Sequence, residues 1–260
     1  MSSEDFPAYK AFILAAGFGT RLRPVTEKIP KPIVQINGRS LLWRTLDRLR
    51  AYGTREVVVN AHYLPEHIKD HVDEYLRLYP QMCIHVSFEE AVLDTGGGVF
   101  HALHFFDRDE PFFVIAGDNL WIDRNDDTYG SGRLSALQKL ACGWDDHNMD
   151  ILTLMKPVLH MRLTDGVGDY HFREDGRVFR SFDKTGTHMW TNIRLNHPRV
   201  FEHIDKQAFS FLEIMDWCER QGRLWAQEYD GQWYHISTPD DLECVDRYIR
   251  EAEDISGGFD

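Results

Sequence analysis

The chain has 260 residues, a formal net charge of −13 at pH 7 and four cysteines. This length suffices for one large α/β domain with a sizeable core, and the acidic balance excludes an extended nucleic-acid-binding surface. The cysteines lack paired spacing, which disfavours a disulfide framework and a zinc knuckle, and no segment is apolar over a membrane-spanning length. We therefore expect a soluble, cytoplasmic protein that binds neither nucleic acid nor membranes.

The first predicted element is the short apolar run Ala11–Ala16, which is typical of a strand buried on both faces of a parallel sheet. Gly17 and Gly19 follow it, and glycines in this place let backbone N–H groups approach a ligand closely. Arg21 comes next, and Lys31 stands between two prolines. Guanidinium and ammonium groups suit phosphate oxygens, so the stretch predicts a nucleotide phosphate loop with a second phosphate anchor.

Two common phosphate motifs do not fit this stretch. The dinucleotide-binding fingerprint needs a third glycine where this chain has Leu22, which disfavours a nicotinamide or flavin site. The Walker loop needs Gly-Lys-Ser/Thr, which the stretch lacks as well.

Strands and helices alternate through the first half of the chain, as in a doubly wound, mostly parallel sheet. A short strand and turn are predicted at 34–38, and further strands at 56–60, 82–88 and 111–117. The predicted helices begin after Ser40, at Pro65 and at Val99. Ligands in such sheets bind beyond the carboxyl ends of the strands. Gly17, Asn60, Glu89 and Asp118 fall at those ends, so we expect them to share one rim.

Two features of this rim predict contact with a nucleotide and a metal. In the segment DTGGG, Thr95 and the glycines after it are expected to leave the first N–H groups of the next helix bare, against the base and sugar. Asp118 follows a very apolar strand, where an unpaired charge is costly. A hard divalent cation is its natural partner beside triphosphate oxygens.

The second half of the chain is predicted to be largely antiparallel. An Asp-Gly turn joins the predicted hairpin strands 168–172 and 177–182. The other predicted elements are a polar loop at 125–132, helices at 134–142, 211–221 and 241–250, and strands at 150–155 and 224–229. We expect this half to form a lid over a sugar, and residues 251–260 to form a frayed tail.

The stretch from Leu14 to Pro32 matches the pattern LAAGxGTRLxPxTxxxPKP, and here the chain resembles the sugar-1-phosphate nucleotidyltransferases. The resemblance implies a Rossmann-like, doubly wound mixed α/β sheet of the nucleotide-diphospho-sugar transferase type, with a smaller antiparallel sugar-binding lid. We expect a single domain over residues 1–260, with a nucleotide-binding half at 1–155 and a sugar-binding half at 156–250.

The resemblance and the chemistry of the residues together predict three catalytic side chains. Arg21 is expected at the β- and γ-phosphates and Lys31 at the α-phosphate or the sugar phosphate. Asp118 matches the family's aspartate that carries catalytic Mg²⁺, with Mn²⁺ as the alternative metal. The other predicted nucleotide-binding residues are Leu14, Ala15, Ala16, Gly17, Gly19, Thr20, Asn60, Thr95, Gly96 and Gly97.

On the sugar side the resemblance implies three residues. Asp169 corresponds to a family position near the sugar, and Asn192 stands where relatives often have glycine. Lys184 corresponds to the lysine of a Glu-Lys-Pro element that holds the sugar phosphate, but different residues flank it here. A solvated surface lysine is the alternative interpretation of Lys184.

The segment Gln232–Asp240, QWYHISTPD, departs from the family's Trp-x-Asp-x-Gly-Thr-Pro, because His235 replaces the aspartate that is the second Mg²⁺ ligand. Imidazole is a poor ligand for Mg²⁺ but an acceptable one for Mn²⁺ or Zn²⁺. Four alternatives stay open: His235 binds a softer metal, contacts phosphate as a cation, leaves the metal to Asp118 and phosphate oxygens, or marks a non-catalytic site.

The predicted reaction joins a nucleoside triphosphate (NTP) and a sugar-1-phosphate into a nucleotide sugar with release of pyrophosphate. The resemblance favours UTP and N-acetylmuramate-1-phosphate, in cell-wall recycling, over GTP and mannose-1-phosphate. CTP with phosphocholine, and a non-catalytic nucleotide-sugar binding protein, are the further alternatives. We expect a monomer or a small homo-oligomer.

Overall fold

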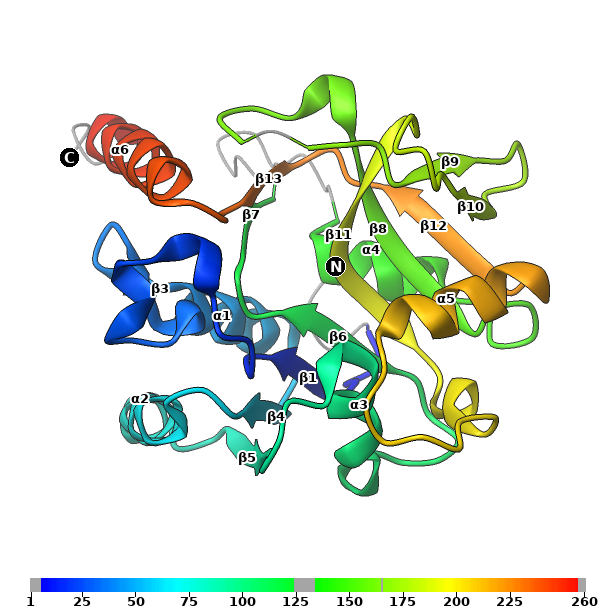
Figure 1. Ribbon diagram of the computed structural model, residues 1–260, viewed down its shortest axis with the longest axis horizontal. Coiled ribbons are helices and arrows are strands. Elements are labelled where there is room, and N and C mark those ends of the chain that lie inside the picture. Colours follow the sequence, from blue (N-terminus) through cyan, green and yellow to red (C-terminus); the bar gives the residue numbers. More distant parts are fainter. Residues whose placement is uncertain (1–5, 124–133, 165, 257–260) are drawn as a thin grey trace.

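The computed structural model describes residues 6–123, 134–164 and 166–256, so the predicted loop 125–132 and the tail residues 257–260 lie outside it. Its centre is a nine-stranded mixed sheet, drawn in Figure 1. The strands are β1 (Ala11–Leu14), β4 (Glu56–Ala61), β5 (Cys83–Phe88), β6 (Phe112–Ala116), β8 (Ile151–Pro157), β9 (Tyr170–Phe172), β10 (Val178–Arg180), β11 (His188–Asn196) and β12 (Leu224–Glu228).

The two halves of the chain join this sheet differently. The order along its main path is β10-β9-β11-β6-β1-β4-β5, and β6, β1, β4 and β5 run parallel to one another. β11 is antiparallel to both β6 and β8, and β12 is parallel to β8. The predicted mixed sheet, parallel in the first half and largely antiparallel in the second, is confirmed.

Helices cover both faces of the sheet, because successive side chains of a strand point to opposite sides. On β1, Ile13 packs in the apolar cluster under α1 (Leu41–Tyr52), α2 (Pro65–Leu78) and α4 (Ala136–Gly143). Phe12 packs in the opposite cluster, under α3 (Asp94–His101) and α5 (Phe211–Arg220). The cap predicted at Ser40 is present, since its Oγ accepts a hydrogen bond from the Trp43 N–H at 3.0 Å.

Smaller elements bring the end of the chain back to its beginning. β7 (Asn119–Ile122) pairs with β13 (Gln232–His235), and β2 (Gln35–Ile36) pairs with β3 (Arg39–Ser40). α6 (Pro239–Ser256), red in Figure 1, lies beside the blue β2–β3 hairpin, where the Asn37 N–H donates to Asp246 Oδ1 at 2.6 Å. Single 3₁₀ turns occur at Thr20–Leu22, Val25–Glu27, Lys31–Ile33, Leu103–Phe105, Val158–His160 and Pro198–Phe201.

Three predicted elements differ from the structure. α3 begins at Asp94 rather than at Val99, so the glycines 96–98 lie inside the helix. α6 continues to Ser256, so residues 251–256 of the predicted tail are helical. β5, predicted over 82–88, begins at Cys83 and is an edge strand whose Phe88 is 47% exposed. Within the described residues, no helix combines the length and apolar character needed to cross a membrane.

Candidate active site

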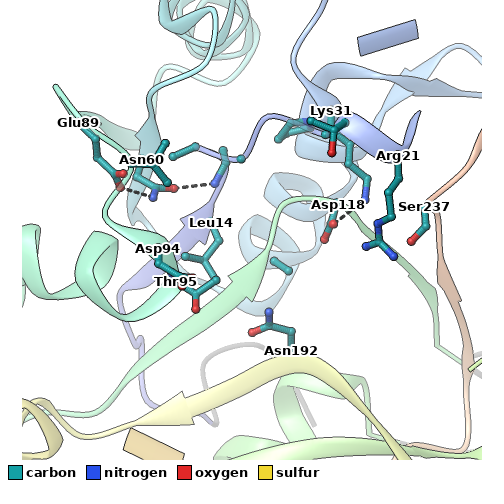
Figure 2. A pocket seen from close by; sticks show the side chains of 18 residues that line it. Leu14, Arg21, Lys31, Asn60, Glu89, Asp94, Thr95, Asp118, Asn192 and Ser237 are labelled. Atoms are coloured by element: carbon teal, nitrogen blue, oxygen red, sulfur yellow. Dashed lines mark hydrogen bonds and ion pairs between the residues drawn. The ribbon is translucent and has the colours of Figure 1, made fainter. Parts of the chain in front are cut away.

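A cleft of about 480 Å³ opens at the carboxyl ends of β1, β4 and β6, where ligands bind in sheets of this kind. Gly17, Asn60, Glu89 and Asp118, predicted to share one rim, all line it. Figure 2 shows Asn60 and Glu89 at one end of the cleft and Arg21, Lys31, Asp118 and Ser237 at the other. The remaining lining residues are Leu14, Ala15, Ala16, Gly19, Thr20, Pro32, Val92, Asp94, Thr95, Ala116 and Asn192.

The cationic end of the cleft is centred on an ion pair. Lys31 is only 8% exposed, and its Nζ donates to Asp118 Oδ2 at 2.7 Å. Burial acts to raise the pKa of Asp118, but the ammonium of Lys31 outweighs it, so the pKa lies below its usual range and the carboxylate is ionised at neutral pH. The 3₁₀ turns after Gly19 and Pro30 bring Arg21 and Lys31 into the same cleft, so two cations and one carboxylate meet there.

The two glycines of the loop, Gly17 and Gly19, are needed for different physical reasons. Gly19 has a φ of +62°, and a Cβ there would lie 3.0 Å from Thr26 Cγ2 and 3.1 Å from Lys31 Cβ. The Thr26 hydroxyl also donates to Gly19 O at 2.8 Å, which ties the two parts of the motif together. A Cβ on Gly17 would meet nothing within 4 Å, so this backbone is open to the cleft.

The opposite end of the cleft is fixed by a buried polar network. Asn60 Oδ1 accepts a hydrogen bond from the Ala15 N–H at 2.6 Å, and Asn60 Nδ2 donates to Glu89 Oε1 at 2.6 Å. Glu89 Oε2 accepts in turn from the Leu93 N–H at 3.2 Å. The side chain of Asn60 thereby fixes the end of β1, where the glycine loop begins. Glu89 was predicted at the rim but not as a site residue, and its place directly after a strand was the available signal.

One part of the prediction for the α3 glycines is wrong, namely that their backbone N–H groups are bare. The N–H groups of Gly96 and Gly97 donate to Phe209 O at 2.9 and 3.1 Å, so they are not bare. A Cβ on Gly96 would lie 2.3 Å from Phe209 Cε2, and one on Gly97 would lie 2.2 Å from Gln207 O. These glycines let a segment of the second half pack against α3, and neither lines the cleft, whereas Thr95 does.

Of the residues predicted on the sugar side, the structure brings only Asn192 to the cleft, from β11. Asp169 and Lys184 lie outside the cleft lining and pair with each other, at 2.6 Å between Oδ1 and Nζ. Asp169 also accepts a hydrogen bond from the Trp190 N–H at 3.2 Å. Their contacts within the chain hold the hairpin region to β11, and their role as sugar ligands stays a prediction.

The sequence over residues 10–130 matches the nucleotidyl transferase family. Residues 10–130 form a nucleotidyl transferase domain. The chain is similar to an N-acetylmuramate α-1-phosphate uridylyltransferase of Caulobacter vibrioides, at 29% identity over 245 residues, with 93% of this chain and 97% of that protein covered. It is also similar to a mannose-1-phosphate guanyltransferase of Neurospora crassa, at 27% identity, with 90% of this chain but only 62% of that protein covered.

A solved UDP-glucose pyrophosphorylase in complex with UDP-glucose superposes with a TM-score of 0.73 at 16% identity, covering 94% of this chain and 100% of that one. This likeness confirms the predicted nucleotide-diphospho-sugar transferase fold. The loop, Arg21, Lys31 and Asp118 all fall inside the nucleotidyl transferase domain, whereas Asn192 and Ser237 come from the remainder of the chain.

Members of the nucleotidyl transferase family generally use a divalent metal ion, and the donors of this chain fit one in part. Asp118 offers a carboxylate whose side chain is 34% exposed in the cleft. Mg²⁺ needs only one or two carboxylates when phosphate oxygens and water complete its shell. Across the described residues there is no group of three or more His, Cys, Asp or Glu side chains placed to hold a metal.

His235 was predicted as a possible second metal ligand, and that role stays a prediction. It lies outside the cleft lining, and its buried Nε2 has no hydrogen-bond partner among the described residues. Burial lowers the pKa of His235, so its imidazole is neutral at pH 7, and the alternative in which it contacts phosphate as a cation loses support. Ser237, two residues further on, lines the cleft instead, and nothing in its residue type pointed to it.

Proposed function

We propose that this protein transfers a nucleoside monophosphate from an NTP to a sugar-1-phosphate, giving a nucleotide sugar and pyrophosphate. The observation that carries the proposal is the Lys31–Asp118 pair, 2.7 Å apart, in one cleft with Arg21 and the glycine loop. Two polyanionic substrates repel each other, and fixed cations beside open backbone N–H groups offset that repulsion.

The chain's residues have little covalent chemistry to perform in such a reaction. A phosphate oxygen of the sugar phosphate attacks the α-phosphorus in line, and pyrophosphate leaves. The attacking group has a second pKa of about 6, so it is ionised at neutral pH and needs no general base. We assign Arg21 to the β- and γ-phosphates, because its planar fork grips two oxygens, and Lys31 to the oxygens between the two substrates.

Asp118 would hold the divalent metal, Mg²⁺ or Mn²⁺, together with phosphate oxygens. When bound, the ion would supply positive charge that offsets the negative charge of the phosphates. In the structure Lys31 pairs with Asp118 through Oδ2, and its ammonium keeps this carboxylate ionised.

For the substrates we propose UTP and N-acetylmuramate-1-phosphate, with a role in cell-wall recycling in the cytoplasm. The support is similarity that extends over 97% of the Caulobacter uridylyltransferase, compared with 62% of the Neurospora guanyltransferase. GTP with mannose-1-phosphate is the second candidate. We further propose that residues 1–260 act as one catalytic domain, as a monomer or a small homo-oligomer.

The test is pyrophosphate release from every pairing of UTP, GTP, CTP and dTTP with N-acetylmuramate-1-phosphate, mannose-1-phosphate, glucose-1-phosphate and phosphocholine. Reactions with Mg²⁺, with Mn²⁺ and with a chelator are run side by side. We expect turnover with UTP and N-acetylmuramate-1-phosphate that the chelator abolishes. Turnover only with GTP and mannose-1-phosphate would select the second candidate, and NTP binding without any release would show a binding protein instead.

A further inference from the structure

Asn192 has an unusual backbone conformation at the wall of the cleft. Its φ is +57°, in the left-handed region that non-glycine residues seldom occupy, and the register of β11 against β8 shifts between Trp190 and Arg194. Such an irregularity in a strand redirects a side chain. Figure 2 shows the Asn192 side chain projecting into the cleft, across from the residues of the nucleotidyl transferase domain.

This irregular segment is held firmly on both sides of Asn192. The Thr191 hydroxyl donates to Leu154 O at 2.7 Å, and Asn119 Nδ2 donates to Thr191 O. The indole of Trp190 donates to Thr153 Oγ1 at 3.0 Å. The backbone at Asn192 is therefore fixed in place, and only the amide of its side chain remains to be oriented.

Arg194 orients that amide. Its side chain is fully buried, and its Nη1 donates to Asn192 Oδ1. The guanidinium carbon lies 3.7 Å from the ring centre of Phe211 and 5.4 Å from that of Trp190. Within the described part of the chain, Nε and Nη2 have no hydrogen-bond partner, and no carboxylate forms an ion pair with this group.

A buried guanidinium without an ion pair is costly, and Arg194 gains none from the residues that the structure describes. Burial lowers the pKa of Arg194 to about 9, which still leaves the group charged at neutral pH. A charged donor on Oδ1 fixes which end of an amide faces the cleft and polarises its N–H bonds. Burial of this cation therefore favours a role in orienting the Asn192 amide over a role in stabilising the fold.

We infer that Arg194 is a positioning residue for the second substrate: by holding Asn192 Oδ1, it turns Nδ2 into the cleft as a strong donor to an acceptor oxygen on the sugar. The inference rests on the proposed function and makes it more specific. It favours sugar phosphates that bear a carbonyl or carboxylate oxygen at this wall, since such oxygens accept best from a polarised amide.

The test compares the variants R194M, R194K and N192A with the native protein, using the sugar phosphate and NTP that give the highest turnover. In R194M an apolar side chain of similar length replaces the charge, so we expect the melting temperature to stay equal or rise. The KM for the sugar phosphate should rise about tenfold, and the KM for the NTP should stay within about twofold. R194K should recover part of the loss, because an ammonium can also donate to Oδ1.

N192A should raise the KM for the sugar phosphate about tenfold. The KM of the double variant N192A/R194M should exceed that of N192A by less than about twofold, because the two changes remove the same interaction. R50M is the matched control. Arg50, on α1, lies 4.2 Å from the centre of the Tyr79 ring, and its Nε also lacks a hydrogen-bond partner among the described residues. Unlike Arg194 it has a carboxylate nearby, with Nη2 3.9 Å from Asp47 Oδ1, and it does not line the cleft. R50M should leave both KM values unchanged.

A lowered melting temperature of R194M with unchanged KM values would assign Arg194 a structural role and overturn the inference. Additive losses in N192A and R194M would overturn it as well, because the two residues would then act separately. If the native protein turns over no sugar phosphate at all, it is the proposed function that fails.

Discussion

Replacing Lys31 with methionine would separate the contribution of its ammonium to stability from its contribution to catalysis. Breaking a fully buried ion pair costs about 3–5 kcal/mol, but the Asp118 side chain is 34% exposed and water solvates part of its charge. We therefore expect K31M to lower the free energy of unfolding by about 1–2 kcal/mol. Catalysis should suffer more, because one preorganised charge at the reacting phosphates supplies about 3–4 kcal/mol, a loss of about 10²–10³ in kcat/KM.

Urea denaturation measures the first effect and pyrophosphate release the second. The double variant K31M/D118N removes both charges, so it should regain most of the lost stability and none of the activity. K69M is the control, since Lys69 pairs with Asp73 at 2.8 Å on the exposed side of α2, and both quantities should stay unchanged. A K31M enzyme with kcat/KM within about threefold of native would refute the assignment of Lys31 to the phosphates.

Three further predictions concern packing, pH and the polar network. G96A should lower the free energy of unfolding, measured in urea, by about 1–3 kcal/mol, because its Cβ would lie 2.3 Å from Phe209 Cε2. G17A is the control and should not lower it, since a Cβ there meets nothing within 4 Å. Equal stability of the two variants would contradict the packing role of Gly96. Burial lowers the pKa of His71 below its ordinary 6.5, so the unfolded chain binds the proton first and stability should decrease as pH falls below 6.5. Urea titrations at pH 8 and pH 5 should show a smaller decrease for H71Q, which cannot titrate at this position, than for the native protein, because buried His197 and His235 still contribute. N60D should place two carboxylates at the 2.6 Å contact with Glu89 Oε1 and cost about 1–3 kcal/mol by the same assay at pH 8, and N60D/E89Q should restore most of it.

The sequence predicted the fold and the cationic end of the cleft well, because both depend on local patterns. Apolar runs and caps mark the elements, and residues that follow parallel strands must meet at one edge, as Gly17, Asn60 and Asp118 do. The glycines of α3 were misinterpreted for a physical reason. In a sequence, a glycine that leaves room for a ligand cannot be distinguished from one that leaves room for a distant segment of the chain. The structure shows the second case, because Phe209 packs against Gly96.

The residues that sequence reasoning missed depend on contacts between distant segments. Nothing in the letters around Arg194 shows that its guanidinium is buried beside Phe211, or that it holds the amide of Asn192. Ser237 enters the cleft only because β13 pairs with β7, a register that a single sequence does not reveal. Lys184 and Asp169 were predicted near the sugar, but no motif indicated that they pair with each other. The fold of the hairpin region brings them together.

The position of β11 between β6 and β9 limits how this protein can be divided or recombined. A fragment that ends at residue 130 would lack β11, so the hydrogen-bonding edge of β6 would be exposed. It would also lack Phe209, which packs against Gly96. If the proposed sugar specificity is to be exchanged with that of a relative, we therefore expect that a chimera must transfer residues 188–211 as a unit, so that the transferred wall of the cleft keeps its packing against α3.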